Sequence, residues 1–505
     1  MHTDSSPIND VVILGGGSAG WMTAAALAKV FENKALKVRL IESQAVGTVS
    51  VGEATIPQIS RFNKLLGLDE NDFVKHTKGT FKLGIEFANW RQKGHAYMHP
   101  FGSYGTNMDA IQFHHYWLKM FQLGKAPELD KFSLLCTAAY SGKFNRPQPI
   151  KNSPLADIPY AFHFDATLYA EYLRKFAEAR GVTRIEGKVQ DVFTRNSNGF
   201  VDALLLENGE RIHADLFIDC SGFRALLIEK TLNTGYEDWG HWLPCDRAVA
   251  MPCEAKNKVY PYTISTAQDA GWTWRIPLQH RIGNGYVYPS EFVSDDEAVD
   301  VLKQQMENTP LAEPNQLRWK TGRREKAWHK NVVAIGLSAG FIEPLESTGL
   351  HLIQSGISRL MAFFPNQGFN QIDIDEFNAQ SKLEMEQIRD FIILHYKLTD
   401  REDTEFWRYC KHMDVPQGVT DKLNLYASNG RIFRKDNELF DETSWLAVMH
   451  GQGLQPQAYH PIVDNLPESE ISRRLAHIQK VIETSVATMP MQADFIDKHC
   501  KATMM

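Results

Sequence analysis

The chain has 505 residues, of which 43% are hydrophobic and 23% charged, with a formal net charge of −7. This length predicts two or three joined units, and the composition is ordinary for a globular protein. The negative charge and the lack of a long basic run argue against a nucleic-acid partner, and no stretch approaches the roughly 20 apolar residues of a membrane-spanning helix.

The N-terminal residues and the cysteines indicate the compartment. Residues 1–9 are polar and lack the apolar centre of a secretion signal. The six cysteines are scattered without a CxxC pair, which indicates reduced thiols and not a disulfide framework or a zinc site. We therefore expect a cytoplasmic protein that binds no metal.

The first predicted elements form a βαβ unit. Residues 10–14 are a short apolar run, residues 21–28 are helix formers, and residues 36–42 indicate a second strand. Two later runs, 215–219 and 331–336, resemble further strands of the same parallel sheet. The cofactor domain is therefore expected to be discontinuous, with insertions at about 54–160 and 223–330.

A glycine motif, Gly15-x-Gly17-x-x-Gly20, lies between the first strand and the helix. The first two glycines permit a tight turn and close backbone approach, and the third lets the helix pack on the strand. The exposed amides at such a helix start bind a pyrophosphate. Glu42 follows Gly20 by 22 residues, the spacing of an acceptor for a ribose hydroxyl, and disfavours the 2′-phosphate of NADP. The motif predicts dinucleotide binding.

Residues 79–90 alternate in the manner of a strand. One face would carry Phe81, Leu83, Ile85 and Phe87, and the other Lys82, Gly84 and Glu86. From this alternation alone, Lys82 would be a solvated strand residue.

The middle insertion predicts an antiparallel sheet that covers the cofactor. Within it, Trp272 and Trp274 would point to the same face of an extended segment and form a wall of two indoles. A bare pair of this kind is more often a cross-sheet pair in a core.

The last third of the chain has helical periodicity. The segment Glu343-Pro344-Leu345-Glu346-Ser347-Thr348-Gly349 precedes a helix that starts near Leu350, so that Ser347 or Thr348 would cap the helix and Glu346 would favour its dipole. Further helices are expected at 350–364, 374–396, 404–411 and 473–488. We predict a cofactor domain over 1–350 and a mostly helical substrate region over 351–505.

Three blocks, at 15–20, 271–277 (GWTWRIP) and 341–350 (FIEPLESTGL), together resemble the flavin-dependent halogenases of the tryptophan halogenase family. The resemblance extends from about residue 9 to residue 461. It implies an α/β (mixed α+β) fold of the two-part FAD-dependent monooxygenase type, in which a Rossmann-like FAD domain carries an inserted antiparallel sheet and a mostly helical substrate cap. FAD is implied over NAD because segments 215–224 and 333–340 resemble the second and third flavin-contacting strands.

The resemblance also implies the cofactor and halide sites. Segment 50–57 (SVGEATIP) resembles the one beside the isoalloxazine ring. The implied FAD contacts are Gly15, Gly17, Ser18, Ala19, Gly20, Glu42, Val51, Gly52, Glu53, Ala54, Asp219, Gly336 and Leu337. Reduced FAD (FADH2) would come from a separate flavin reductase, and a halide ion, chloride or bromide, would bind at the amides of Ser347, Thr348 and Gly349.

Two catalytic residues follow from the same resemblance. The pattern Lys-x-x-Ile-x-Phe-x-Asn-Trp over 82–90 gives Lys82 the role of the family's essential lysine, and Glu346 that of the second catalytic residue. A lysine can hydrogen-bond hypohalous acid or, once deprotonated, form a haloamine, and the sequence does not choose between these. In the family, the pair Trp272 and Trp274 separates the substrate from the flavin, which opposes a hydroxylase.

The substrate residues implied are His99, Pro100 and Phe101, with Trp445 as a third aromatic. Tryptophan halogenases grip the amino-acid head group with a tyrosine-rich segment and a glutamate, whereas segment 437–443 here has no tyrosine. We therefore expect a small electron-rich arene, such as indole or a phenol, in place of free tryptophan. A homodimer remains one option, because the sequence does not decide the oligomeric state.

Three other functions remain open from the sequence. An aromatic hydroxylase of the same fold would need its substrate at the flavin. An NAD dehydrogenase would use only the glycine motif. A non-catalytic flavin-binding protein would have no reason to retain Lys82 together with Glu346.

Overall fold

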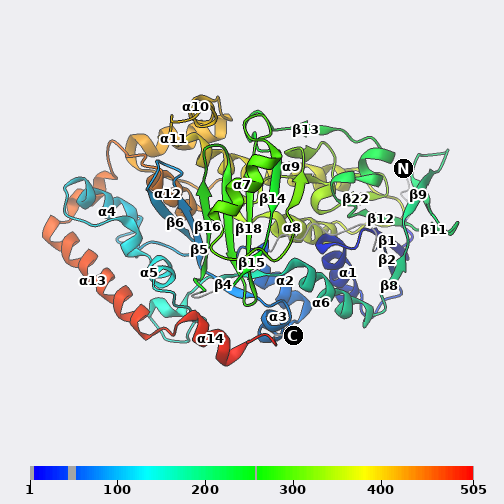
Figure 1. Ribbon diagram of the computed structural model, residues 1–505, viewed down its shortest axis with the longest axis horizontal. Coiled ribbons are helices and arrows are strands. Elements are labelled where there is room, and N and C mark those ends of the chain that lie inside the picture. The colour runs from blue at the N-terminus through cyan, green and yellow to red at the C-terminus, as the bar shows by residue number, and fades with distance from the viewer. Residues whose placement is uncertain (1–4, 44–52, 256–258, 504–505) are drawn as a thin grey trace. The chain divides into compact units, whose positions relative to one another are not determined.

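The computed structural model describes residues 5–43, 53–255 and 259–503 (Figure 1). The chain forms two compact units, each assembled from three segments. Unit 1 comprises Met1–Lys78, Phe164–Asp246 and Arg318–Glu386; unit 2 comprises Gly79–His163, Arg247–Leu317 and Gln387–Met505. No unit boundary falls at residue 350, where we predicted one. Helix α8 (Gly349–Ala362) belongs to unit 1 because it packs against α1 (Ser18–Val30).

Unit 1 is built on a largely parallel sheet of strand order β21-β22-β12-β1-β2-β8. Strands β1 (Asp10–Leu14), β2 (Lys37–Glu42), β12 (Leu216–Asp219) and β22 (Val332–Ala334) confirm the four strands predicted from the apolar runs. β8 (Thr183–Glu186) extends the parallel pairing, and β21 (Trp328–His329) closes the other edge antiparallel. The central strands are nearly continuous apolar runs because both faces of a parallel sheet are covered.

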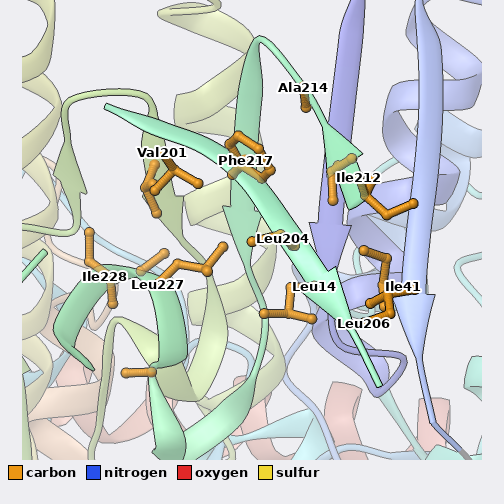
Figure 2. Close-up of a cluster of buried hydrophobic side chains, with 14 residues drawn as sticks. Leu14, Ile41, Val201, Leu204, Leu206, Ile212, Ala214, Phe217, Leu227 and Ile228 are labelled. Carbon is orange, nitrogen blue, oxygen red and sulfur yellow. The ribbon is translucent and has the colours of Figure 1, made fainter. Parts of the chain in front are cut away.

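Helices and a small sheet cover the central strands of unit 1. Helices α1 and α6 (Ala166–Glu178) pack on each other, and residues 20–28 of α1 are buried. Strands β9 (Val189–Thr194), β10 (Val201–Leu206) and β11 (Arg211–His213) form the small sheet. In Figure 2, Leu204 and Leu206 of β10 belong to one buried cluster with Leu14 and Phe217 of the central strands. This packing fixes the strand ends that carry the glycine motif.

The remaining elements of unit 1 are short. Strands β13 (Tyr236–Asp238), β20 (Gly322–Arg324) and β23 (Gly340–Phe341) form a further small sheet. Helices α2 (Ile59–Leu66) and α3 (Glu70–His76) follow the segment that begins with β3 (Glu53–Ala54).

Unit 2 contains a large sheet of strand order β19-β14-β18-β17-β16-β5-β6, with β15 also paired to β18. Most neighbours are antiparallel, and β16 with β5 is parallel. The strands are β5 (Gly84–Ala88), β6 (Ala96–Pro100), β14 (Arg247–Ala250), β15 (Cys253–Glu254), β16 (Tyr262–Ala267), β17 (Trp272–Pro277), β18 (Arg281–Tyr288) and β19 (Asn315–Arg318). The predicted inserted sheet is therefore confirmed.

Outside its strands, unit 2 is mostly helical. The predicted helices correspond to α8, α9 (Gln371–Lys397), α10 (Glu405–His412) and α13 (Glu468–Thr488), of which α8 lies in unit 1 and α9 crosses the unit boundary. The unpredicted ones are α4 (Phe113–Gln122), α5 (Leu134–Tyr140), α7 (Asp295–Gln305), α11 (Gln417–Asn429), α12 (Glu442–Gly451) and α14 (Gln492–His499). Among the described residues, no helix is both long and apolar enough to cross a membrane.

The single strand predicted over residues 79–90 is wrong. The segment divides at Leu83 into β4 (Thr80–Lys82), which pairs antiparallel with β7 (Ala161–Phe164), and β5, which belongs to the large sheet. The Leu83 amide donates to Pro261 O at 2.7 Å, outside either pairing. Lys82 is consequently fully buried and not solvated.

Candidate functional site

The glycine motif lies where β1, β12 and β22 of unit 1 end. Gly15 has φ +116°, and a Cβ there would lie 2.2 Å from Cys220 O. A Cβ on Gly20 would lie 1.8 Å from Gly15 O, whereas one on Gly17 would meet nothing within 4 Å. Gly15 is thus required by the turn and Gly20 by helix packing, whereas Gly17 leaves open space beside the first turn of α1. Because the first amides of a helix lack intrahelical acceptors, this space fits a pyrophosphate.

Glu42 lies at the end of β2 against the same loop. A Cβ on Gly16 would come 1.5 Å from Glu42 Oε2, so the carboxylate covers this glycine. Trp21 Nε1 donates to Oε2 at 3.3 Å and Arg184 Nε donates to Oε1 at 2.5 Å. Each carboxylate oxygen can accept a second hydrogen bond, so a ribose hydroxyl can join these partners.

Asp219 holds the adjoining turn together. Its Oδ1 accepts from the Ser221 amide and hydroxyl, and its Oδ2 accepts from the amides of Leu227 and Ile228. Ser338 Oγ lies 3.2 Å from Oδ1 and shares its one hydrogen with Gly222 O at 3.1 Å. The four bonds from Ser221, Leu227 and Ile228 occupy the acceptor sites of this fully buried carboxylate. The prediction that Asp219 contacts the cofactor therefore changes, because its side chain shapes the loop instead.

Of the remaining residues predicted to contact the cofactor, the structure describes some and not others. Gly336 begins the short turn Gly336–Ser338, which includes Leu337, and a Cβ on Gly336 would lie 2.9 Å from Ala19 Cβ beside Ser18. Ala54 is buried and Glu53 lies in β3, whereas Val51 and Gly52 fall outside the described residues. The residues of unit 1 that the structure describes thus fit a dinucleotide such as FAD.

Glu346 ends a short 3-10 turn, Pro344–Glu346, just before α8. Ser347 follows with φ +59°, and the Ser347 amide donates to Pro344 O at 3.0 Å. This bond occupies one of the three amides predicted to bind halide and leaves those of Thr348 and Gly349 at the helix start. Thr348 Oγ1 is buried without a hydrogen-bond partner among the described residues, and a Cβ on Gly349 would meet nothing within 4 Å. An unpartnered hydroxyl beside open helix amides suits a small anion.

In unit 2, Lys82 is brought together with the predicted substrate loop. β6 pairs with β5 so that His99 lies opposite Ile85, and the Phe101 amide donates to Leu83 O at 3.0 Å. Lys82 Nζ consequently lies 5.2 Å from the centroid of the Phe101 ring. A buried ammonium facing an aromatic ring can interact with its π face. Pro100 is buried at the end of the same strand.

Trp272 and Trp274 lie on one face of β17, as the alternation predicted. Their ring centroids are 6.2 Å apart, and Trp272 lies 6.5 Å from Trp90. Trp90 in turn contacts Trp407 of α10 at 5.6 Å. The predicted pair is therefore one end of a larger buried wall, which we call the tryptophan wall (Trp90, Trp272, Trp274 and Trp407).

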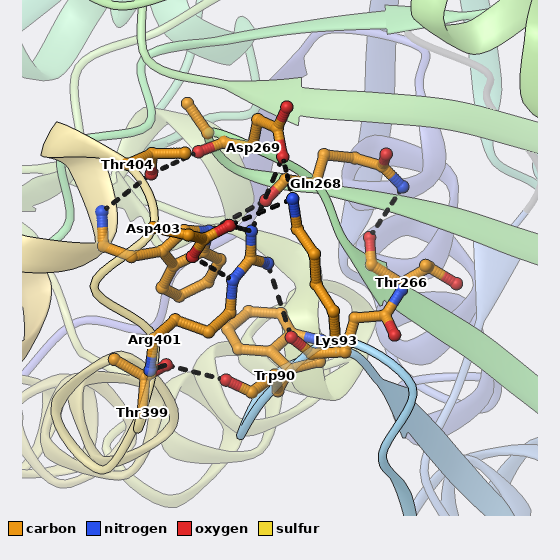
Figure 3. Close-up of polar contacts among 12 residues, drawn as sticks. Trp90, Lys93, Thr266, Gln268, Asp269, Thr399, Arg401, Asp403 and Thr404 are labelled. Atoms are coloured by element: carbon orange, nitrogen blue, oxygen red, sulfur yellow. Dashed lines mark hydrogen bonds and ion pairs between the residues drawn. The ribbon is translucent and has the colours of Figure 1, made fainter.

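A network of hydrogen bonds and ion pairs surrounds the tryptophan wall (Figure 3). Arg401 forms a paired salt bridge with Asp403, at 3.0 and 2.9 Å, and its guanidinium lies 4.7 Å from the Trp407 ring centroid. Lys93 joins Asp269 and Asp403, at 2.9 and 3.0 Å. Trp407 Nε1 donates to Gln268 O, and Thr399 Oγ1 donates to Trp90 O. The segment between α9 and α10 is thereby held against the sheet.

Trp445 and His99 meet in an aromatic cluster that the sequence did not single out. Phe391 stacks on Phe440 with a centroid distance of 3.9 Å, and it contacts Trp445 at 5.3 Å and His99 at 5.7 Å. Trp445 Nε1 is buried without a hydrogen-bond partner among the described residues. Phe391 lies in a helix and Phe440 in a loop, and their spacing gave no signal of contact.

One buried ion pair borders the aromatic cluster. Lys422 Nζ lies 4.4 Å from the Trp445 ring centroid and donates to Glu438 Oε2 at 2.7 Å. The Lys435 amide also donates to Glu438 Oε2. The two charges beside Trp445 are therefore committed to each other and to the protein.

The sequence matches one protein family over most of its length. The family described as tryptophan halogenase matches residues 10–468. Tryptophan 6-halogenase ThaL from Streptomyces albogriseolus is 33% identical, covering 97% of this chain and 98% of that protein. Tryptophan 7-halogenase RebH from Lentzea aerocolonigenes is 32% identical, covering 92% and 93% respectively.

Solved structures match the fold over nearly the whole chain. Xcc4156, a flavin-dependent halogenase from Xanthomonas campestris, superposes with a TM-score of 0.95 and 45% identity, covering 99% of this chain and 100% of that one. BrvH, a flavin-dependent halogenase from Brevundimonas sp. BAL3, gives a TM-score of 0.94 and 47% identity, covering 97% and 99%.

Proposed function

The chain belongs to the tryptophan halogenase family and is a flavin-dependent halogenase that acts on aromatic substrates, and from this premise we propose its substrate and its catalytic residues. The substrate is a neutral electron-rich arene such as indole. Lys82 and Glu346 carry the reaction. The observation that carries the proposal is the fully buried Lys82 ammonium beside the Phe101 ring.

The cofactor residues support a cycle that begins with reduced FAD from a separate reductase. The glycine motif and Glu42 would hold the dinucleotide, and the amides of Thr348 and Gly349 with Thr348 Oγ1 would hold chloride or bromide. Bound reduced FAD would supply, with oxygen and halide, hypohalous acid. The tryptophan wall would keep the arene away from the flavin.

Lys82 and Glu346 divide the halogenation step between them. The Lys82 ammonium hydrogen-bonds the oxygen of hypohalous acid and polarises the halogen. A ring carbon attacks the halogen, the oxygen–halogen bond breaks, and the oxygen leaves as water with a proton from Lys82. Glu346 then accepts the ring proton as general base. Transfer through a haloamine on Lys82 is the second route.

The aromatic cluster supports a neutral substrate. Phe101 and Trp445 supply flat apolar rings and His99 a flat polar one, and the Trp445 N–H, which has no partner among the described residues, is a donor. Lys422 and Glu438 neutralise each other, so neither is free to bind the carboxylate or ammonium of tryptophan. Desolvating a zwitterion beside this pair would cost free energy without compensation.

The test is an aerobic assay with FAD, a flavin reductase, NADH and bromide, read by mass spectrometry. We expect bromoindole from indole and a lower kcat/KM for tryptophan. Lys82→Met should abolish the product, whereas Lys119→Met, which removes another buried lysine, paired with Asp464 at 2.8 Å, should retain it. Oxygenated products without halogen would contradict the reaction, and a higher kcat/KM for tryptophan than for indole would contradict the substrate.

A further inference from the structure

A fully buried histidine, His163, lies beside the strand that carries Lys82. In the pairing of β4 with β7, His163 is opposite Thr80 and Ala161 is opposite Lys82. Thr80 and Lys82 are two residues apart, so their side chains leave β4 on the same face. The surroundings of His163 therefore bear on where Lys82 lies.

Hydrogen bonds to both ring nitrogens assign the tautomer of His163. Thr80 Oγ1 donates its one hydrogen to Pro277 O at 2.7 Å. The contact of 3.0 Å between Thr80 Oγ1 and His163 Nδ1 must then be a bond from Nδ1–H to the Thr80 oxygen. In a neutral ring Nε2 becomes the acceptor, so Thr263 Oγ1 donates to it at 2.9 Å.

The charge state agrees with this assignment. Burial lowers the pKa of His163 well below its usual value, and the nearby Lys82 charge lowers it further. The ring is therefore neutral near neutral pH and adds no positive charge beside Lys82.

The network joins four strands near Lys82, namely β4, β7, β16 and β17. Through Thr80 it links β4 to Pro277, the last residue of β17, which carries Trp272 and Trp274. Through Thr263 it links β7 to β16. β4 spans only three residues, so these bonds contribute to its position, together with the bond from the Phe81 amide to Gln492 Oε1 at 2.9 Å.

We propose that His163, as the neutral Nδ1–H tautomer, is a positioning residue that fixes Lys82 by tying Thr80 of β4 to Thr263 of β16. The inference rests on the proposed role of Lys82. His163 touches neither substrate nor cofactor in this role. It aligns the lysine with hypohalous acid, and misplacement of a catalytic group by about 1 Å can cost on the order of 100-fold in rate.

Paired variants separate positioning from packing. Thr80→Val removes the hydroxyl at constant volume, and Thr80→Ser keeps it. An asparagine amide superposes on Nδ1 and a glutamine amide on Nε2, so His163→Asn keeps the bond to Thr80 and His163→Gln keeps only the bond to Thr263. We expect kcat for arene bromination to fall about 10- to 100-fold in Thr80→Val and His163→Gln, with KM within about threefold. Thr80→Ser and His163→Asn should recover most of kcat.

A trap for free hypohalous acid supplies the second readout. In Thr80→Val and His163→Gln, halogenation of an added β-diketone should rise while bromoindole falls, because hypohalous acid still forms and is no longer captured. Wild-type kcat in Thr80→Val, or equal losses in His163→Asn and His163→Gln, would overturn the proposal. If the wild type formed neither bromoindole nor the trapped product, the proposed function itself would fail.

The tautomer can be tested without cofactor or turnover. Nitrogen NMR of histidine-labelled apo-protein, with His163→Asn to assign the signal, should show a proton on Nδ1 and none on Nε2 at neutral pH. A proton on Nε2, or on both nitrogens, would overturn the assignment whatever the enzyme halogenates.

Discussion

Glu346 is a buried carboxylate whose proposed role depends on its basicity and not on its shape. Glu346→Gln keeps the volume and removes the base. We expect kcat for bromination to fall about 100- to 10,000-fold, the usual contribution of a general base, with an unchanged melting temperature. Glu343→Gln is the matched control, because Glu343 is equally buried three residues earlier. Comparable rates for the two variants would remove Glu346 from the mechanism.

For the buried ion pair of Lys422 and Glu438, the prediction concerns the free energy of unfolding. Both side chains are less than 10% exposed, so removing one leaves the other charge buried and unpaired. Lys422→Met should lower the free energy of unfolding by about 3–5 kcal/mol. The double variant Lys422→Met with Glu438→Leu should regain most of this, because a buried pair replaced by apolar groups is often neutral. Urea unfolding of the single and the double variant measures this. Equal losses of unfolding free energy in the two variants would mean that the pairing of Lys422 with Glu438 does not stabilise the protein.

At the scale of elements, the glycine motif contains one residue needed for folding, Gly20, and one expected to affect cofactor binding, Gly17. A methyl group on Gly20 would overlap Gly15 O, whereas one on Gly17 would enter open space. We expect Gly20→Ala to lower the melting temperature of the apo-protein substantially and Gly17→Ala to leave it nearly unchanged. Gly17→Ala should instead weaken FAD binding, because its methyl group occupies the place where the pyrophosphate approaches the backbone. FAD titration and thermal melting of both variants measure this; normal FAD affinity in Gly17→Ala would place the pyrophosphate elsewhere.

How far the sequence predicts an element depends on whether its pattern is local. The runs at β1, β2, β12 and β22 are predictable because a strand buried on both faces is apolar throughout. The break at Leu83 is not, since the alternation continues across it and only tertiary pairing assigns Lys82 to β4. Local alternation therefore gave Lys82 the wrong environment, although the wider motif singled it out.

The candidate site shows the same limit. The glycine spacing predicts the turn, and Trp272 and Trp274 share a face as expected. The contact of Ser338 with Asp219 and the stack of Phe391 on Phe440 join residues far apart in sequence, so no spacing reveals them. Contacts of this kind determine which predicted residues remain available to a ligand.

At the scale of the whole chain, buried neutral histidines set the response to acid. Burial lowers the pKa of His114 to about 4, and burial also lowers the pKa of neighbouring His115 to about 3. His114 Nε2 donates to Gly430 O at 2.7 Å at the end of α11. In the unfolded chain both rings take up a proton near pH 6.5. Between pH 6.5 and about 4 the unfolded state therefore binds protons that the folded state does not.

The sign of the pH dependence follows. Above pH 6.5 the two states bind equal numbers of protons at these sites and stability is unaffected; as pH falls below 6.5, the unfolded state is favoured until the folded protein also protonates. For His114 alone the loss is about 2 kcal/mol at pH 5, at roughly 1.4 kcal/mol per pH unit. His114→Gln keeps an N–H for Gly430 O and cannot titrate, so it should lose less stability than the wild type between pH 7 and pH 5. Urea midpoints at the two pH values test this, with His412→Gln, at an exposed histidine, as the control. The wild type and His412→Gln both retain the His114 ring. An equal drop in the urea midpoint of all three proteins would therefore show that His114 does not set the acid response.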